Sequence, residues 1–396
     1  MSGAGPDLGA TFVRWVFCRA VLHRGWWLVT SIYLVVDARL TASQLVLIGV
    51  AQAGIGLLFE IPAGVVADTL SRTWSLAVSH LLMGVAMLTT GLVTDFRAVL
   101  ATQMLWGLSW TFASGADVAW ISDELDEPAR VPVVLIRAEQ AQLGGTVAGL
   151  AGIGGLAWLT GRATAMVLAG AAMLLLGLYV VAGFRERRFV PAPARRWRAG
   201  RRILAHGSRL VAASRVLLAV FAATFLVNGV IGAFGRLYPL RLVELAPAVD
   251  PTVWITGLSV VMCLAGAFAL RATQRTIDGP HTVRRGYVAA CAVGVIGVAG
   301  LALAPGPAGA GAAVVLAAGA LPLTRSFGTI WVNSETTGAV RATVHSLFAQ
   351  ADYAGTIVCG LAVAVIAGRA GLVYALAGCV AFLVGAIIVA QRAPRR

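Results

Sequence analysis

Gly64-Val-Val-Ala-Asp68-Thr-Leu-Ser-Arg72 stands where a long apolar segment of the chain ends. Asp68 and Arg72 are four residues apart, about one helical turn, so their side chains share a face if this stretch is helical. Gly64 lies on the same face and would let a neighbouring helix approach closely. The stretch therefore predicts an acid–base hinge in a short loop between two membrane-spanning helices.

The composition indicates that the whole chain belongs in a membrane. Of its 396 residues, 59% are hydrophobic and 12% are charged, and the mean hydropathy is +0.85. Apolar runs of roughly 20 residues recur, each long enough as a helix to cross the ~30 Å hydrocarbon core. The alternating pattern of a transmembrane barrel, about 10 residues per strand, is absent. We therefore expect an all-α integral membrane protein in a lipid bilayer.

Twelve apolar segments are predicted to span the membrane. They cover residues 13–36, 43–67, 74–94, 98–121, 133–158, 162–183, 216–239, 252–271, 285–304, 308–331, 341–367 and 370–391. One long polar stretch separates the first six from the last six. This layout predicts two pseudo-symmetric six-helix halves, residues 1–183 and 216–396, joined by a basic linker at 184–215.

The arginines predict the orientation of the chain. All 31 basic residues are arginines, the chain has no lysine, and the net charge is +14. The arginines gather in every second connection and in the linker, and basic loops of this kind stay in the cytoplasm. We expect a multi-pass protein of the plasma (inner) membrane with both termini cytoplasmic. Nucleic-acid binding is not expected, because the basic residues do not form one soluble face.

Several short motifs resemble those of the major facilitator superfamily, in particular its drug-exporter-like branch. Besides Gly64 to Arg72, they are Phe59-Glu60-Ile-Pro62, Ser114-Gly115-Ala116, Trp120-Ile-Ser-Asp123-Glu124, Arg137-x-x-Gln140 and Arg341-Ala-Thr343. The fifth segment, with Gly145 and Gly149, is similar to the glycine-rich antiporter helix but lacks its usual Gly-Pro pair. Gln103 stands where many proton-coupled exporters have an arginine. The resemblance implies alternating access of two halves and export of a small hydrophobic molecule or drug in exchange for protons.

The resemblance also implies a conformational switch, or gate, near the hinge. Its residues are Gly64, Asp68, Arg72, Asp123, Glu124 and Arg341. Asp68 is expected to face the start of the eleventh segment near Arg341, because a helix N-terminus carries about half a positive charge. Arg72 is expected to pair with Asp123 or Glu124.

Four carboxylic acids lie deeper in apolar segments and are candidates for proton coupling. They are Glu60, Asp117, Glu139 and Asp352. A charge within a membrane span costs about 3 kcal/mol or more, so such a residue usually faces a partner or a water-filled path. Glu60 lies beside Pro62, where a kink could expose it to a central cavity. The alternative is that these acids only form structural ion pairs or hydrogen bonds.

A further set combines aromatic, basic and amide side chains that could line a cavity for the substrate. It comprises Arg19, His23, Trp26, Trp106, Trp110, Asn228 and Arg325. Aromatic walls suit a planar or lipophilic molecule. Such residues also serve commonly as packing or lipid-facing groups, so this alternative stays open.

No catalytic residue, metal or cofactor is predicted. The five cysteines lack metal or redox spacing, and no HExxH, Walker A or Gly-x-Ser-x-Gly motif occurs. The expected partners are a small-molecule substrate, protons and the bilayer, and we expect a monomer that is not an enzyme. An importer or dedicated metabolite exporter of the same superfamily is the alternative, and a transporter-like sensor or membrane-embedded enzyme comes from a different class.

Overall fold

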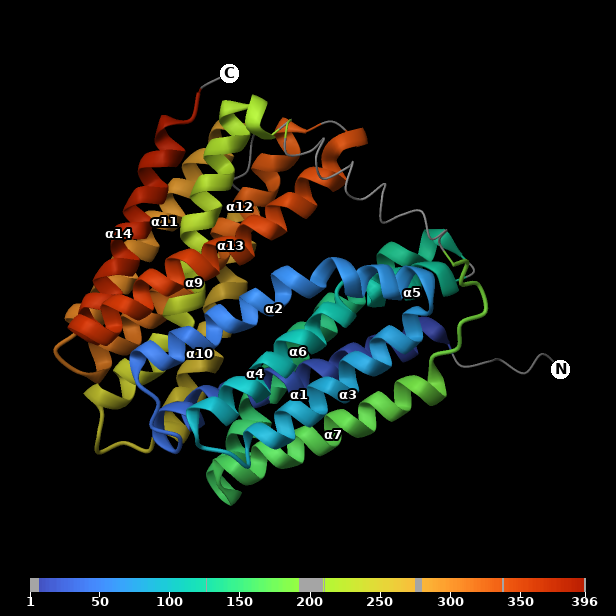
Figure 1. Ribbon diagram of the computed structural model, residues 1–396, viewed down its shortest axis with the longest axis horizontal. Coiled ribbons are helices and arrows are strands. Elements are labelled where there is room, and N and C mark those ends of the chain that lie inside the picture. Colours follow the sequence, from blue (N-terminus) through green and yellow to red (C-terminus); the bar gives the residue numbers. More distant parts are fainter. Residues whose placement is uncertain are drawn as a thin grey trace. The chain divides into compact units, whose positions relative to one another are not determined.

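The computed structural model describes residues 7–125, 127–191, 209, 211–274, 280–336 and 338–394, and the regular elements in these ranges are helices (Figure 1). The first part of the chain forms α1 (Leu8–Val36), α2 (Ala42–Thr69), α3 (Arg72–Thr90), α4 (Phe96–Ala113), α5 (Ala116–Glu124), a 3₁₀ turn at Pro128–Arg130, α6 (Val131–Thr160) and α7 (Arg162–Gly183). The second part forms α9 (Arg215–Leu245), α10 (Pro251–Gln274), α11 (Pro280–Leu303), α12 (Pro307–Glu335), α13 (Gly338–Ala370) and α14 (Leu372–Arg392).

Ten of the described helices are long and apolar enough to cross a membrane. Helices α1 and α4 are not among them, and α1 carries Arg14, Arg19 and Arg24. The predicted segment 98–121 is not one helix. Gly115 has φ +74, a left-handed conformation that glycine adopts without strain, and this residue separates α4 from α5. The number of twelve spans therefore stays a prediction.

The described residues form two compact units. Unit 1 contains α1, α3 to α7, the part of α2 from Leu58 onward, and Thr252–Gly257 of α10. Unit 2 contains Leu40–Leu57, which includes the first part of α2, together with α9, the part of α10 from Leu258, and α11 to α14. Two helices, α2 and α10, thus contribute to both units. Most of the predicted basic linker, 192–208 and residue 210, lies outside the described residues.

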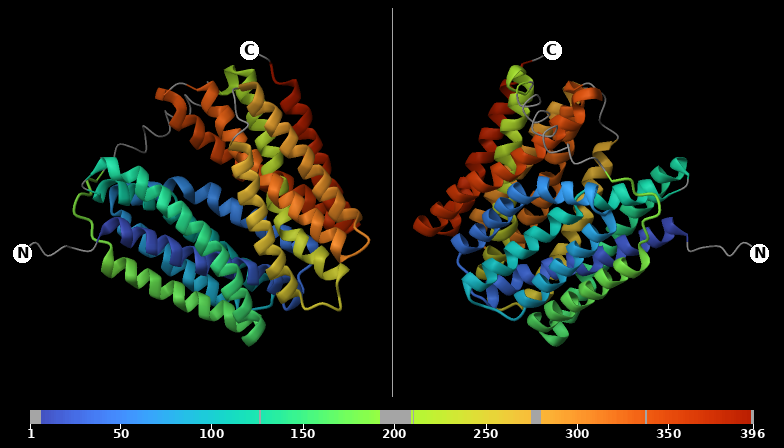
Figure 2. Two further views of the ribbon diagram at one scale, coloured as in Figure 1. Left: turned by 180° about the vertical axis from the view of Figure 1, so that it is seen from behind. Right: turned by 45° about the vertical axis from the view of Figure 1, so that its right-hand side comes forward.

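In unit 1, α1 packs along α6 and α7, and α3 packs against α4 and α7 (Figure 2). Glycines set the distance between α1 and α6. A Cβ atom at Gly149 would lie 2.3 Å from the carbonyl oxygen of Val21, and one at Gly25 would lie 2.4 Å from that of Gly149. The glycines of the fifth predicted segment therefore serve here as a packing surface for α1.

Unit 2 shows the same device between α9 and α13. A Cβ atom at Gly355 would lie 2.0 Å from the carbonyl oxygen of Phe225, and one at Gly229 would lie 2.3 Å from the Cβ of Cys359. Helix α9 also contacts α12 and α14, and α11 packs with both of these helices. The backbone contact between α9 and α13 brings their polar side chains within reach of each other.

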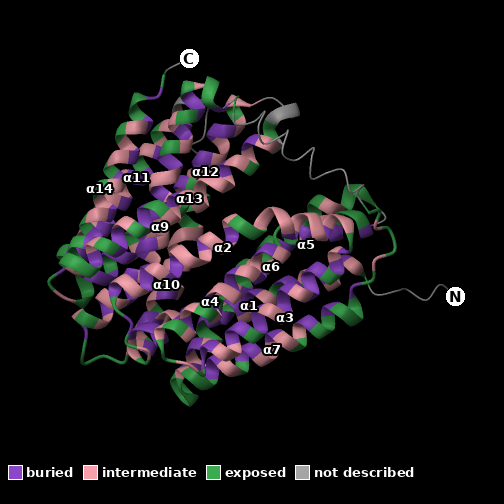
Figure 3. Cartoon of the chain, viewed as in Figure 1, coloured by how far each residue is buried: buried purple, intermediate pink, exposed green. Residues whose placement is uncertain are grey.

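The core of unit 1 that supports the polar sites is aromatic. Phe12, Trp15, Trp120 and Phe184 are buried in one cluster with apolar residues of every helix from α1 to α7. Figure 3 shows buried positions recurring along these helices. Because the cluster joins all the helices from α1 to α7, it fixes the ends of α3, α5 and α7 relative to one another.

Candidate functional site

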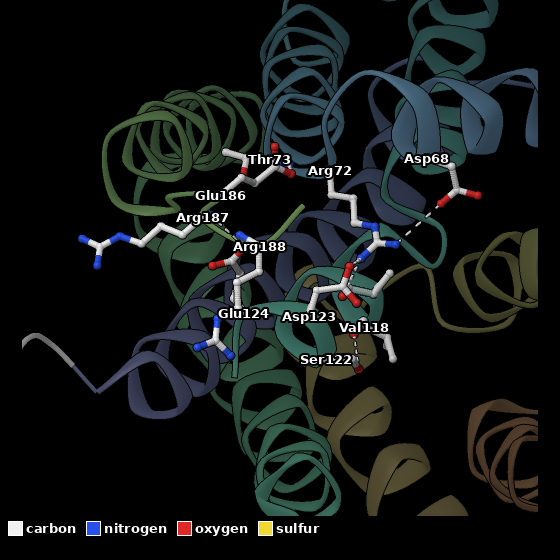
Figure 4. A network of polar contacts seen from close by, with 11 residues as sticks. Asp68, Arg72, Thr73, Val118, Ser122, Asp123, Glu124, Glu186, Arg187 and Arg188 are labelled. Carbon is white, nitrogen blue, oxygen red and sulfur yellow. Dashed lines mark hydrogen bonds and ion pairs between the residues drawn. The ribbon is translucent and has the colours of Figure 1, made fainter. Parts of the chain in front are cut away.

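Arg72 lies at the centre of a polar network in unit 1 (Figure 4). Its guanidinium group forms an ion pair with Asp123 and donates to the carbonyl oxygen of Ala119 at 2.9 Å. Asp68, one turn before Arg72, lies 3.9 Å from the guanidinium. The ring of Phe189 lies 5.7 Å from the Arg72 Cζ atom, close enough for a cation–π contact. Arg72 is therefore held by groups from three separate segments.

Local sequence explains how α3 and α5 bring these groups together. Only Leu70 and Ser71 separate α2 from α3, and the Ser71 hydroxyl caps α3 by accepting from the Trp74 N–H at 3.0 Å. The turn at Gly115 starts the short helix α5, which carries Asp123 to the same end of unit 1. A tight loop and a broken helix thus place Arg72 beside Asp123.

Glu186 and Glu124 connect the segment after α7 to this network. Glu186 is not among the residues predicted from the sequence. Its carboxylate accepts from the Ser71 hydroxyl and from the Thr73 N–H, each at 2.7 Å. Glu124 is buried and accepts from the backbone N–H groups of Arg187 and Arg188, each at 3.0 Å. The expectation that Arg72 pairs with Asp123 or Glu124 thus resolves to Asp123.

An aromatic side chain anchors the start of the same segment. Phe184 stacks on Trp120 with a centroid separation of 4.2 Å and meets Trp15 edge-on at 5.4 Å. We call Phe184–Arg188 the strap. It follows α7 and is bonded to the start of α3 through Glu186 and to the end of α5 through Glu124. One signal for the strap was present in the sequence: Glu186 is the only acid among the described residues 184–191.

Two other expectations for the gate stay predictions. Within its unit, no described atom lies within 4 Å of a Cβ built at Gly64, so no close helix contact occurs there within unit 1. Arg341 donates to the carbonyl oxygen of Thr336 at 3.4 Å. Asp68 and Arg341 belong to different units, and their contact stays a prediction.

A second polar cluster of unit 1 lies deeper, between α1 and α5. Arg19 forms an ion pair with Asp117 at 3.0 Å, and the two side chains are 12% and 17% exposed. The Arg19 Cζ atom also lies 4.4 Å from the centroid of the Trp15 ring. The candidates Arg19 and Asp117 thus neutralise each other in a setting with little water.

Three of the residues predicted for a cavity wall, His23, Trp106 and Trp110, stack on one another within unit 1. The imidazole ring stacks on Trp106 at 5.5 Å and meets Trp110 edge-on at 4.8 Å. Within the described part of the chain, the His23 Nε2 atom and the indole nitrogens of Trp106 and Trp110 are buried and have no hydrogen-bond partner. Trp26 is fully buried and donates to the carbonyl oxygen of Met87 at 3.1 Å, so it packs inside unit 1, and its role at a cavity stays a prediction.

Unit 2 brings together three of the predicted residues: Asn228 on α9, Arg325 on α12 and Asp352 on α13. The Asn228 amide donates to one carboxylate oxygen of Asp352, and the Arg325 guanidinium lies 3.8 Å from the other. Asp352 is 16% exposed, whereas Arg325 is 71% exposed. The acid is therefore held mainly by a neutral amide, with a cation at its open side.

The two remaining candidate acids differ in their surroundings. Glu60 accepts from the Ser114 hydroxyl at 2.7 Å, at the break between α4 and α5. Glu139 is exposed on α6, and no hydrogen bond or ion pair joins it to another described residue. Among the described residues, no group of three or more His, Cys, Asp or Glu side chains could hold a metal ion.

No protein-family model matches the chain, and no curated protein matches its sequence. Solved structures match nearly its whole length. A point mutant of the nucleoside transporter NupG has a TM-score of 0.80 at 12% identity, with 98% of this chain and 100% of that chain covered. A bacterial homologue of the human lysosomal transporter Spinster, in an inward-facing and occupied conformation, has a TM-score of 0.71 at 16% identity, with 98% of both chains covered.

A POT family transporter in complex with 5-aminolevulinic acid has a TM-score of 0.73 at 10% identity, with 99% of this chain and 96% of that chain covered. The chain has the fold of these membrane transporters. The neighbours are transporters of the major facilitator type, and at identities of 10% to 16% the likeness concerns the fold. The drug-exporter-like branch is thus not distinguished from the others.

Proposed function

We propose that this protein is a secondary active transporter that exports a small hydrophobic molecule in exchange for protons. The observation that carries the proposal is the match of its fold to transporter structures over nearly the whole chain, at a TM-score of up to 0.80 among those described above. Such folds work by alternating access, in which two halves expose one binding region to each side of the membrane in turn. The coupling ion and the cargo are inferred from individual side chains.

Asp352 is our candidate for the proton-coupling acid. An acid that exchanges protons must be stable in both its charged and its neutral form during the transport cycle. Asn228 supports both forms, because an amide offers a donor and an acceptor. Arg325 at 3.8 Å favours the charged form, and its exposed side chain can move away. The site thus has a neutral holder and a movable cation.

The stack of His23, Trp106 and Trp110 is our candidate for cargo recognition. Aromatic faces bind planar apolar groups, and a buried polar group without a partner is costly. The two indole N–H groups are donors only, so they suit a molecule that carries a hydrogen-bond acceptor on an apolar body. We therefore expect a lipophilic cargo with at least one carbonyl, ether or ring nitrogen.

The test begins by identifying a cargo. Drug susceptibility and metabolite release are compared between strains with and without the protein, and the best compound is then offered to inverted membrane vesicles with an imposed proton gradient. We expect accumulation that rises with the gradient and collapses when a protonophore is added. Accumulation that ignores the gradient would contradict antiport.

An importer or a dedicated metabolite exporter is the second candidate. It is favoured by the polar molecules named for similar structures, a nucleoside and 5-aminolevulinic acid, and by the exposed Arg325 guanidinium, which could bind an anionic group. Right-side-out vesicles distinguish an importer from an exporter, and the comparison of drug susceptibility with metabolite release distinguishes the two kinds of exporter. Import predicts gradient-driven uptake into them, whereas export predicts uptake only into inverted vesicles.

A further inference from the structure

Residues of α10, α11 and α12 in unit 2 line an open groove with a volume of about 600 Å³. Its walls are almost entirely small or apolar and include Ala269 on α10, Ala289 and Val293 on α11, and Leu316 and Phe327 on α12. None of the acids or aromatic residues proposed above for transport lines it. The groove is therefore separate from the residues proposed above for transport.

The groove has a polar end and an apolar end. Thr273 at the end of α10 and Thr282 and Arg285 at the start of α11 lie at one end, and Val293 lies toward the other. Thr282 and Val293 are about 16 Å apart along α11, at 1.5 Å per residue. This length is about half of the ~30 Å hydrocarbon core, which is the depth of one leaflet.

The arginine at the polar end is available for a ligand. Arg285 is exposed, and no hydrogen bond or ion pair joins it to another described residue. Its neighbour Arg284 is engaged, since it donates to the carbonyl oxygen of Ala393 at 3.1 Å. Arg285, which has no partner among the described residues, thus stands at the entrance of an apolar groove of leaflet depth.

We propose that this groove binds one acyl chain of an anionic phospholipid whose phosphate contacts Arg285. The apolar walls match an acyl chain, and the length matches one leaflet. A guanidinium group binds phosphate through paired N–H donors, and the Thr282 hydroxyl can donate to a further headgroup oxygen. A neutral apolar cargo would fill the walls but would leave the charge at the entrance without a counterion.

The proposal can be tested by crosslinking in vesicles. The purified protein is reconstituted in phosphatidylcholine vesicles that contain a small fraction of phosphatidylglycerol with a photoreactive acyl chain, and the adducts are mapped by mass spectrometry. We expect adducts on the groove-lining residues of α10, α11 and α12. Their yield should exceed that of a matching phosphatidylcholine probe by about fivefold, the factor expected for one arginine at a membrane surface.

Two pairs of variants locate the site. Arg285→Gln should lower the adduct yield of the phosphatidylglycerol probe to that of the phosphatidylcholine probe. Its control is Arg271→Gln, which should leave the yield unchanged, because Arg271 is exposed at the end of α10 and does not line the groove. Ala289→Trp fills the groove and should abolish adducts of both probes. Ile296→Trp, at an exposed position on the same helix outside the groove, is its control.

Three results would overturn the proposal: equal yields for the two probes on the unchanged protein, equal losses for Arg285→Gln and Arg271→Gln, or undiminished adducts in Ala289→Trp. The second result would indicate general attraction of anionic lipid to a basic surface. The readout is lipid binding and not flux, so a failure here leaves the proposed transport function untouched.

Discussion

The two units hold their buried acids in opposite ways. In unit 1, Arg19 and Asp117 are 3.0 Å apart and both are largely buried, and Trp15 covers the arginine. In unit 2, Arg325 lies 3.8 Å from Asp352 and is mostly exposed, while a neutral amide holds the acid. In the first arrangement both charges of a close pair are buried together. In the second, the cation of the pair is mostly exposed.

This difference separates a structural acid from a candidate coupling acid. Neutralising one member of a tight ion pair leaves the charge of the other uncompensated at a site with little water. The pair therefore resists a change of charge. For an acid beside an exposed cation and an amide, a change of charge costs less free energy, because water and the amide compensate the groups that remain. Of the four acids that the sequence offers, Asp352 therefore becomes the preferred candidate for proton coupling, and Asp117 becomes a part of the framework.

The largest effect is expected from breaking the ion pair of unit 1. Arg19→Leu leaves Asp117 unpaired and should lower the free energy of unfolding by about 3–5 kcal/mol, measured by denaturation in detergent. The double change Arg19→Leu with Asp117→Leu should recover most of the loss. Arg14→Leu, at an exposed position of α1, is the matched control, and an equal cost for both single variants would contradict the framework role.

The strap should show a smaller loss of stability. Glu186→Ala removes the acceptor for the Ser71 hydroxyl and the Thr73 N–H. Loss of hydrogen bonds to a charged group should lower the free energy of unfolding by about 1.5–3 kcal/mol. The same denaturation experiment on Arg185→Ala, an exposed neighbour, provides the reference. If the two variants unfold alike, the strap does not hold α3.

Changing the acid of unit 2 should affect transport more than stability. In Asp352→Asn the new amide still accepts from Asn228, so the free energy of unfolding should change by less than about 1 kcal/mol. Gradient-driven accumulation should fall roughly 5- to 150-fold, the usual size of coupling between two sites, while exchange without a gradient continues. Vesicle flux measures both. Accumulation at the original level would move the coupling role to another acid.

The smallest effect on stability is expected at Asp68. Its carboxylate is 40% exposed and lies 3.9 Å from Arg72, so Asp68→Asn should cost only about 0.2–1 kcal/mol in unfolding. The proposed gate role predicts a clear loss of flux despite this small cost. Flux at the full rate in the same vesicles would remove Asp68 from the gate and leave Arg72 as an anchor for α5.

The sequence predicts the hinge but not all the residues that contact it. It leaves two neighbouring acids as possible partners of Arg72, because both stand at the end of the same apolar segment. Neighbouring residues on a helix point about 100° apart, so only the placement of α5 decides that Asp123 faces Arg72 and Glu124 faces the strap. Glu186 stands out in the sequence only as a single acid among arginines, and its contact with Ser71, 115 residues away, comes from the tertiary structure.

The sequence by itself determined the class of protein. The apolar segments have the length of a bilayer-spanning helix, and this length is fixed by the thickness of the hydrocarbon core. Their lengths and the few charges within them can be read directly from the sequence. Only the tertiary structure decided which charges pair. Arg19 meets Asp117 across 98 positions and Asn228 meets Asp352 across 124. The packing of glycines between helices, which no local pattern specifies, sets which of these groups meet.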